Sequence, residues 1–197
     1  MGRSHSQKIL PTIESVLSEA GIGRRELDGI VYGQGPGSFT GVRITVGIVQ
    51  GLAFGLDIPV VGVSTLACLA QQAYRETGAT NIVVALAARA EEVYFGSYVV
   101  DSGMVRLQGV EAVLDAADAP SQSFEECLGV GSGWALRSKL ETALGARATD
   151  VTVECWPRAR ALLELGRDGF DRGIAVPGEK ARPEYLREHV AKPGRPG

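Results

Sequence analysis

The stretch Gly33–Gly55 reads GQGPGSFTGVRITVGIVQGLAFG, and its order of residue types decides the expected fold. An apolar run at Leu27–Tyr32 precedes it, and a second apolar run at Pro59–Val63 follows it. Its glycine-rich start predicts a tight turn, and the mainly apolar residues after Thr40 predict a helix that ends near Gly55. Strand, turn, helix and strand in this order are typical of an α/β layer with parallel strands.

The segments on either side extend this layer. Apolar residues recur at helical spacing from Ile9 to Leu17, which predicts an amphipathic helix that ends at Gly21. After the second strand, Ser64 caps a further helix. The residues Asn81–Ala87 then read as a third strand of the same layer.

The second half of the sequence predicts a different arrangement. Two strands, at Val93–Val100 and Val105–Val110, are joined through Asp101-Ser102-Gly103, which is a signal for a β-hairpin. The alternation of strand and helix gives way here to consecutive strands. We therefore expect an α/β fold with two small subdomains, at residues 1–90 and 91–197.

Four apolar and aromatic residues late in the chain are expected to pack inward. Trp134 and Trp156 read as core residues rather than as platforms for stacked bases. Tyr185 and Leu186 stand in an extended tail that is rich in proline, glycine and charge. A strap that packs both residues onto the body is favoured over a docking motif.

The glycine-rich turn has two possible roles. Glycine permits positive φ and a close approach of the backbone to a ligand, and the start of the following helix can hold an anion. The residues that would do so are Gly35, Gly37, Ser38, Thr40 and Arg43. The turn matches neither a dinucleotide-binding fingerprint nor a P-loop. We therefore interpret this segment as a tight turn before a well-capped helix, with phosphate binding as the alternative.

Three glycines stand in one line along the predicted second helix. Gly47, Gly51 and Gly55 are four residues apart, so they share one helix face. Each costs the helix roughly 0.5–1 kcal/mol relative to alanine, and close packing of another backbone is the usual compensation. The rest of the helix is apolar on nearly every side, as a helix buried on two faces would be. Its partner is either the chain's own first helix or a helix of another chain.

Composition narrows the function classes. The chain has 197 residues, of which 45% are hydrophobic and 22% charged, as in an ordinary globular protein. Its formal net charge of −3 lacks the basic excess of a protein that binds tRNA alone. Three scattered cysteines favour reduced thiols over a disulfide framework or a zinc site. With no apolar signal segment and no membrane span of sufficient length, we expect a soluble cytoplasmic protein.

Groups suited to catalysis are scarce. The two histidines, His5 and His189, stand in terminal segments, and neither zinc-peptidase nor serine-hydrolase motifs occur. We therefore expect no catalytic residue, no metal and no cofactor. Two enzyme classes stay as alternatives: an ATP-dependent phosphotransferase or hydrolase that uses the turn Gly33–Gly41, and a metallopeptidase. The former needs a carboxylate for Mg²⁺, for which Asp28 and Asp57 are the nearest candidates.

Longer stretches of the sequence resemble one protein family. The run GQGPGSFTGVRITVGIVQGLAFGLDIPVVGVSTLACLA, at residues 33–70, resembles the signature region of the TsaB (YeaZ) family. Further segments are similar to motifs of that family: His5-Ser6-Gln7, Arg89 with Glu92-Val93-Tyr94, Gly131-Ser132-Gly133, and Pro183 with Tyr185-Leu186-Arg187. The resemblance covers most of the chain.

The resemblance implies a fold like that of the actin/Hsp70/sugar-kinase (ASKHA) superfamily, with a degenerate nucleotide site. It implies a non-catalytic partner of the enzyme TsaD, which acts with the ATPase TsaE. The assembly makes N6-threonylcarbamoyladenosine next to the anticodon of tRNA, so this subunit would contact tRNA only indirectly. Members of the family also form homodimers.

The resemblance also implies where the partners dock. Both the homodimer and the TsaD pairing use the first two helices, which agrees with the argument from the glycine face. The expected interface residues are Ile9, Ile13 and Leu17 on the first helix and Ile44, Gly47, Ile48, Gly51, Leu52 and Gly55 on the second.

Two features depart from the family pattern. Members usually open with strands that precede the first helix, and this sequence lacks them, which leaves an unpaired apolar edge at Ile30–Tyr32. We expect a shortened version of the protein or a misplaced start codon rather than a natural domain design. Ala87 stands where the family often has Asp, which argues against nucleotide or metal chemistry at that strand end.

Overall fold

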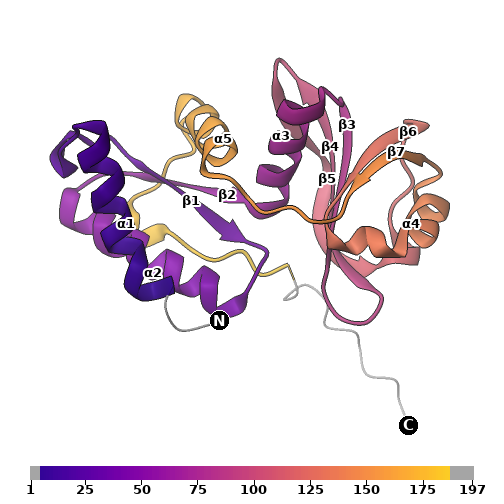
Figure 1. The fold of residues 1–197 in the computed structure, drawn as a ribbon, viewed down its shortest axis with the longest axis horizontal. Coiled ribbons are helices and arrows are strands. Elements are labelled where there is room, and N and C mark those ends of the chain that lie inside the picture. Colours follow the sequence, from indigo (N-terminus) through magenta and orange to yellow (C-terminus); the bar gives the residue numbers. More distant parts are fainter. Residues whose placement is uncertain (1–4, 187–197) are drawn as a thin grey trace, which may run out of the picture.

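Two separate β-sheets, each with its own apolar core, divide the chain into two halves (Figure 1). The computed structural model describes the backbone of residues 5–186 and the side chains of residues 8–186. The first half holds helices α1 (His5–Ala20), α2 (Phe39–Leu56) and α5 (Ala159–Asp171), with strands β1 (Ile30–Gly35) and β2 (Val60–Ser64). The second half holds strands β3 (Asn81–Ala87), β4 (Glu92–Asp101), β5 (Met104–Asp115), β6 (Glu126–Val130) and β7 (Arg147–Thr152), with helix α4 (Arg137–Leu144). Helix α3 (Thr65–Thr77) lies between the halves.

Sheet membership differs from the expected division at residues 90 and 91. Strand β3, expected beside β1 and β2, instead pairs with β4 and β6 in the second sheet. Conversely, α5 and residues 174–184 contact the first half. A Cβ at Gly166 would lie 2.2 Å from Cγ2 of Val31, so a glycine is what lets α5 approach β1 this closely. The chain therefore returns to its first half after completing the second.

The first sheet is a two-stranded parallel ribbon between helices. Ile30 of β1 lies opposite Val60 of β2, and Tyr32 lies opposite Gly62. Helix α2 covers one face of this ribbon, and α5 covers the other. The core beneath α2 consists of Tyr32, Val46, Val49, Ala53, Val60 and Ala181.

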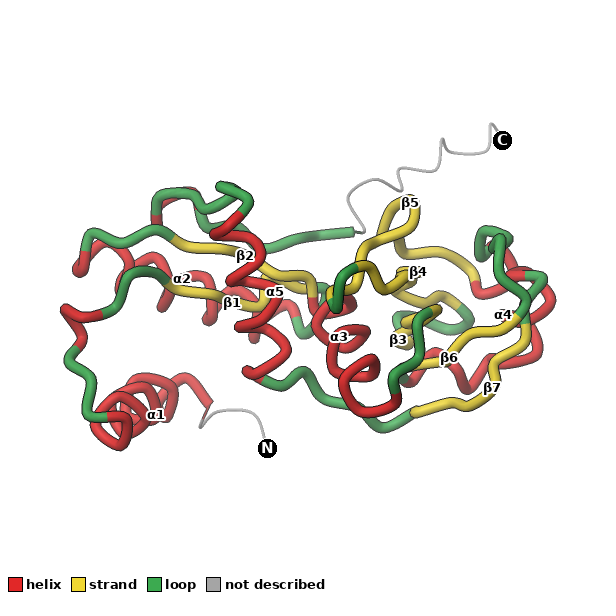
Figure 2. The backbone as a smooth tube through the Cα atoms, turned by 90° about the horizontal axis from the view of Figure 1, so that it is seen from above, coloured by secondary structure: helices red, strands yellow, loops and turns green. Residues whose placement is uncertain are grey.

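The outer edge of β1 pairs with no strand among the described residues. The Ile30 N–H donates to the Pro59 carbonyl at 3.0 Å, so the backbone groups of Val31 and Gly33 point away from β2. A hollow of about 410 Å³ opens along this edge, between β1 and α1. Helix α1 packs closely against no described element and stands apart in Figure 2. The expected unpaired edge at Ile30–Tyr32 is thus present.

The second sheet has the strand order β5-β4-β3-β6-β7. Strands β3, β6 and β7 run parallel, whereas β3, β4 and β5 form an antiparallel meander. The predicted hairpin between β4 and β5 is confirmed, with Ser102 at φ 51° and Gly103 at φ 79° in its two-residue turn. Positive φ at both central residues gives the turn a twist that suits the paired strands.

The two tryptophans have opposite environments. Trp134 is 2% exposed, and its indole N–H donates to the Val83 carbonyl at 2.9 Å, which confirms the core expected there. Trp156 is 77% exposed, so the expectation that it lies in the core is wrong. It stands in the segment between β7 and α5, which crosses from one half to the other over the outside of the molecule (Figure 1).

The strap at residues 174–186 ties the two halves together. Val176 exchanges two backbone hydrogen bonds with Val60, and the Glu184 N–H donates to the Gln34 carbonyl at 2.8 Å. Further along, Leu186 is 8% exposed and belongs to the core of the second half. The strap predicted from Tyr185 and Leu186 is confirmed.

Candidate functional site

The glycine-rich turn places its residues at the start of α2. The Ser38 hydroxyl oxygen accepts a hydrogen bond from the Gly41 N–H at 3.4 Å, and Gly35 has a φ of 110° that favours glycine. Gly37 and Thr40 are exposed beside them. This is the geometry of a tight turn before a capped helix, and anion binding there stays a prediction.

Arg43, expected to help hold an anion, is engaged by other groups. Its guanidinium lies 3.8 Å from the centroid of the Phe39 ring, and its Nε donates to the Tyr185 hydroxyl at 2.7 Å. Cation–π contact and hydrogen bond together fix the side chain against the strap. Arg43 therefore joins the start of α2 to the C-terminal segment.

The turn forms one wall of a cleft of about 860 Å³ between the two halves. The opposite wall includes Arg89, which follows β3, Ser132, which follows β6, and Tyr94 of β4. The Ser132 hydroxyl accepts a hydrogen bond from the Ala87 N–H at 3.0 Å. The turn at Gly33–Gly41 and the segments around Arg89 and Ser132 are far apart in the sequence, yet they line the same cleft. All three were among the segments that resemble one protein family.

The two carboxylates considered for Mg²⁺ lie at the far end of the first half. Asp28 precedes β1, whereas the turn follows β1. Asp57 is the C-terminal cap of α2, and the turn precedes α2. A helix of 18 residues spans roughly 27 Å, so neither side chain reaches the turn. The arrangement does not favour the phosphotransferase alternative.

The glycine face of α2 is uncovered. A Cβ built at Gly47, Gly51 or Gly55 would meet no neighbouring atom of residues 5–186 within 4 Å. The first helix was one candidate to cover this face, and the structure rules that packing out. Helix α2 nevertheless carries Phe54, which is 86% exposed, on the same side. The chain thus presents an apolar helix face that none of its described elements packs against.

The nine expected interface residues fall into two groups. Ile44, Gly47, Gly51 and Gly55 lie on or beside the uncovered face of α2, as does Phe54, which sequence reasoning missed. Ile48 and Leu52 face the hollow instead, together with Ile9, Ile13 and Leu17 of α1, all half-buried. The signal for Phe54 was present in the sequence, since it stands between Gly51 and Gly55 in an all-round apolar helix.

Helix α2 is long and apolar enough to cross a membrane by length and composition, and 17% of that stretch is buried. Among the described helices it alone passes that test. Such a helix is weak evidence for a membrane span, because the same composition suits a helix between two protein surfaces.

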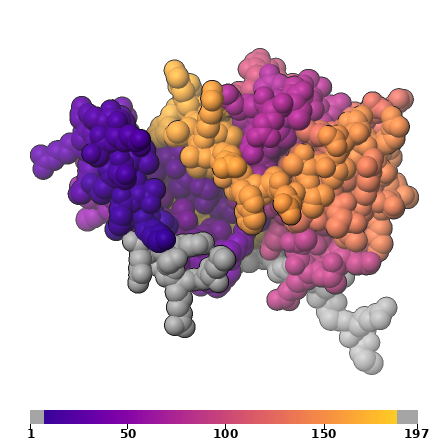
Figure 3. Space-filling view, in the orientation of Figure 1, coloured from indigo at the N-terminus to yellow at the C-terminus, as the bar shows by residue number. Residues whose placement is uncertain are grey.

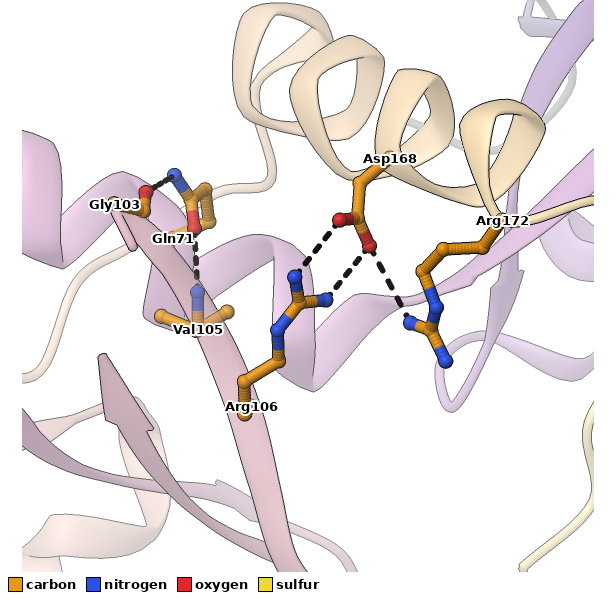
Figure 4. A network of polar contacts seen from close by, with 6 residues as sticks. All are labelled: Gln71, Gly103, Val105, Arg106, Asp168 and Arg172. Carbon is orange, nitrogen blue, oxygen red and sulfur yellow. Dashed lines mark hydrogen bonds and ion pairs between the residues drawn. The ribbon is translucent and has the colours of Figure 1, made fainter. Parts of the chain in front are cut away.

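A polar network connects α3 and α5 to β5 across the boundary between the halves (Figure 4). Arg106 donates to both oxygens of Asp168 at 2.7 and 2.8 Å, and this contact lowers the pKa of the Asp168 carboxyl. Arg172 adds a third hydrogen bond at 3.3 Å. The Gln71 side chain donates to the Gly103 carbonyl and accepts from the Val105 N–H. We interpret this network as a structural link between the two halves.

Residues of the metal-binding types do not gather in the part of the chain that the structure describes: no three His, Cys, Asp or Glu side chains lie together. His189 and the side chain of His5 fall outside that part. Burial raises the pKa of the Cys68 and Cys127 thiols to about 11, which suits packing and not nucleophilic chemistry.

Comparison with known proteins identifies the family. The family model described as "TsaD: tRNA N6-adenosine threonylcarbamoyltransferase" matches residues 1–192. A protein of Escherichia coli K12 named "tRNA threonylcarbamoyladenosine biosynthesis protein TsaB" is 40% identical over 201 residues, which cover 99% of this chain and 86% of that protein. The chain belongs to the TsaB family. A TsaB of Haemophilus influenzae is 35% identical over 99% of the chain.

Solved structures agree with this TsaB assignment. "YeaZ from Pseudomonas aeruginosa" has 42% sequence identity and a TM-score of 0.85, with 92% of this chain and 85% of that chain covered. A second structure from that organism, described as similar to peptidase YEAZ, has 41% identity and a TM-score of 0.87 over 95% of this chain and 86% of that chain. The expected membership of the TsaB (YeaZ) family and the expected α/β fold of the actin/Hsp70/sugar-kinase (ASKHA) type are confirmed.

Proposed function

We propose that this chain is a non-catalytic subunit that docks on a TsaD-like enzyme and supports formation of threonylcarbamoyladenosine in tRNA. Its relatives carry the name of that pathway, and the family model that matches it carries the name of the enzyme. The chain's own role is to present a docking surface, and no residue of it performs the chemistry. The adenosine modified is the one next to the anticodon.

The observation that carries the proposal is the uncovered glycine face of α2. Glycines inside a helix lower its stability, so a face of three of them needs a compensating contact. The described chain supplies none within 4 Å. A helix of a second subunit can approach such a face closely, and Phe54 beside it offers a large apolar anchor.

The same face serves more than one partner in turn. In the absence of the enzyme, two copies of the chain pair through α2 as a homodimer. One apolar face suffices for either partner. A TsaE-like ATPase joins the assembly of chain and enzyme. The site of action is the cytoplasm, where the three free cysteines of the chain stay reduced.

The test is co-purification with a TsaD-like protein followed by light scattering. Gly51→Leu should abolish the complex while leaving a folded chain, because a Cβ at Gly51 meets no atom of the described residues within 4 Å but a leucine there would obstruct a closely packed helix. The matched control is Ser138→Leu, which adds an equal apolar group to the exposed face of α4 and should keep the complex.

Two results would contradict the proposal. A complex that survives Gly51→Leu unchanged would place the docking surface elsewhere. A chain that binds no TsaD-like protein and hydrolyses ATP as a monomer would favour the enzyme alternative and its turn at Gly33–Gly41.

A further inference from the structure

We propose that two copies of this chain pair through antiparallel α2 helices, with Arg43 of each copy beside Asp57 of the other. This pairing rests on the proposed function, in which α2 is the docking surface, and it adds a direction and a charged contact at each end. The partner is a second copy, because the exposed face of α2 complements itself in both charge and shape.

The docking helix carries one charged residue near each end and none between them. Arg43 is the sole charged residue within α2, and Asp57 is its C-terminal cap. Arg43 stands four residues before Gly47, so it continues the line of the glycines. Both charged residues are exposed. They therefore flank an uncharged helix face.

Neither charge is neutralised within the part of the chain that the structure describes. The Arg43 guanidinium contacts the Phe39 ring and the Tyr185 hydroxyl, and it forms no ion pair with a described carboxylate. The Asp57 side chain has no hydrogen bond or ion pair with a described residue. Each charge also lies near the helix end whose partial charge has the same sign, which is unfavourable.

An antiparallel second helix compensates for both charges at once. It brings the N-terminal end of one α2 beside the C-terminal end of the other, so opposite partial charges and opposite side-chain charges meet. A parallel pair would instead bring Arg43 close to Arg43 and Asp57 close to Asp57, and like charges across an interface repel. A two-fold axis between antiparallel copies makes the favourable contact twice.

A two-fold axis near Gln50 and Gly51 also matches the shape of the face. Phe54 and Gly47 are equally far from this point in sequence, on opposite sides, so Phe54 of one copy faces Gly47 of the other. Phe54 is 86% exposed in the single chain, and its ring then packs over a position that has no side chain. Small residues at such a position are what allow two helices to approach closely.

The same axis brings the charged groups together. Arg43 and Asp57 differ by one residue in their distance from it, which is roughly 1.5 Å along a helix, and an arginine side chain spans that offset. Figure 3 shows the N-terminal residues of the chain, which include α2, toward one end of the molecule and the residues of the second sheet toward the other. The pair therefore joins first half to first half.

Reversal of the two charges tests the pairing in the full chain, with sedimentation equilibrium as the measurement. Wild type should be a dimer. Arg43→Glu and Asp57→Lys each bring like charges together at both ends of the helix pair, so each variant alone should dimerise about tenfold more weakly. An equimolar mixture of the two variants should recover the association of wild type, because opposite charges then meet at both ends.

Two further variants isolate the effect of charge. Tyr185→Phe removes the hydroxyl that Arg43 contacts and should dimerise as wild type does. Asp57→Asn removes the charge with a residue that tolerates the φ of 55° at this position, and it should weaken the dimer less than Asp57→Lys does. Urea unfolding checks that every variant is folded.

Three results would overturn the inference: unchanged dimerisation of both charge-reversed variants, a mixture that associates no better than either variant alone, or a wild-type chain that stays monomeric at high concentration. Co-purification with the TsaD-like protein separates the two proposals. A wild-type chain that binds this protein but never pairs with itself contradicts the homodimer alone. A chain that recovers association in the mixture but binds no TsaD-like protein contradicts the proposed function alone.

Discussion

At the scale of single residues, Glu111 shows how burial and hydrogen bonding compete. Its carboxylate accepts a hydrogen bond from the Ser64 hydroxyl at 2.8 Å and another from the Tyr98 hydroxyl. Burial nevertheless raises the pKa of the Glu111 carboxyl, because the loss of water around the charge outweighs the two donors. The folded chain therefore binds a proton at Glu111 more tightly than the unfolded chain does.

This predicts a pH-dependent effect of Glu111→Gln on the free energy of unfolding. The pKa of the Glu111 carboxyl in the folded chain lies above its ordinary value of 4.5. The tighter proton binding therefore stabilises the folded chain fully below pH 4.5, and this stabilisation is lost as the pH rises through the pKa of the folded chain. Relative to wild type, the variant should gain stability over that window. Urea unfolding at a series of pH values measures the difference, with exposed Glu125→Gln as the control. A constant difference across the series would contradict the assignment.

At the scale of elements, α2 shows a conflict between the stability of the free chain and docking. Its Ser38 cap and its apolar inner face, at Val46, Val49 and Ala53, stabilise the helix. Its three glycines oppose this, and the structure shows no contact of the described chain that compensates for them. Such a local departure from good helix-forming residues is typical of a surface selected for binding.

Alanine at the glycine positions should therefore stabilise the free chain. Gly47→Ala and Gly51→Ala should each raise the free energy of unfolding by about 1 kcal/mol, because the added Cβ meets open space. Gly166→Ala is the matched contrast on α5: its Cβ would lie 2.2 Å from Val31, and overpacking should cost roughly 1–3 kcal/mol. Urea unfolding of the three variants checks the sign of each change. A loss of stability in Gly51→Ala would show that this face is packed in solution.

At the scale of the whole molecule, the strap decides how firmly the halves are joined. The Tyr32 hydroxyl pairs with the backbone of Arg182, and Gln50 donates to the Ala181 carbonyl at 3.0 Å. Beyond these contacts with the first half, Leu186 is buried in the core of the second half. The strap thus crosses the boundary that the polar network of α3, α5 and β5 also spans.

Leu186→Ala should therefore loosen the strap as well as lower stability. Removing a buried leucine side chain should cost roughly 2–5 kcal/mol. Hydrogen exchange should also quicken at Val176 and Glu184, whose backbone N–H groups donate to the first half. Leu163→Ala, at a 60% exposed position of α5, should change neither measurement. Unchanged exchange at Glu184 in Leu186→Ala would mean that the strap is held by the first half alone.

The sequence by itself determined the local structure and the family. The helix that Ser64 caps, the hairpin turn at Ser102 and Gly103, and the glycine line of α2 follow rules that act over a few residues. The tertiary structure alone decided that β3 joins the second sheet, that α5 returns to the first, and that Trp156 is exposed. The physical reason is that strand pairing and close packing join residues far apart in the chain, and the same apolar pattern suits either sheet. For the same reason, sequence periodicity predicted that α2 has two apolar faces, and only the fold showed which of them the chain leaves uncovered.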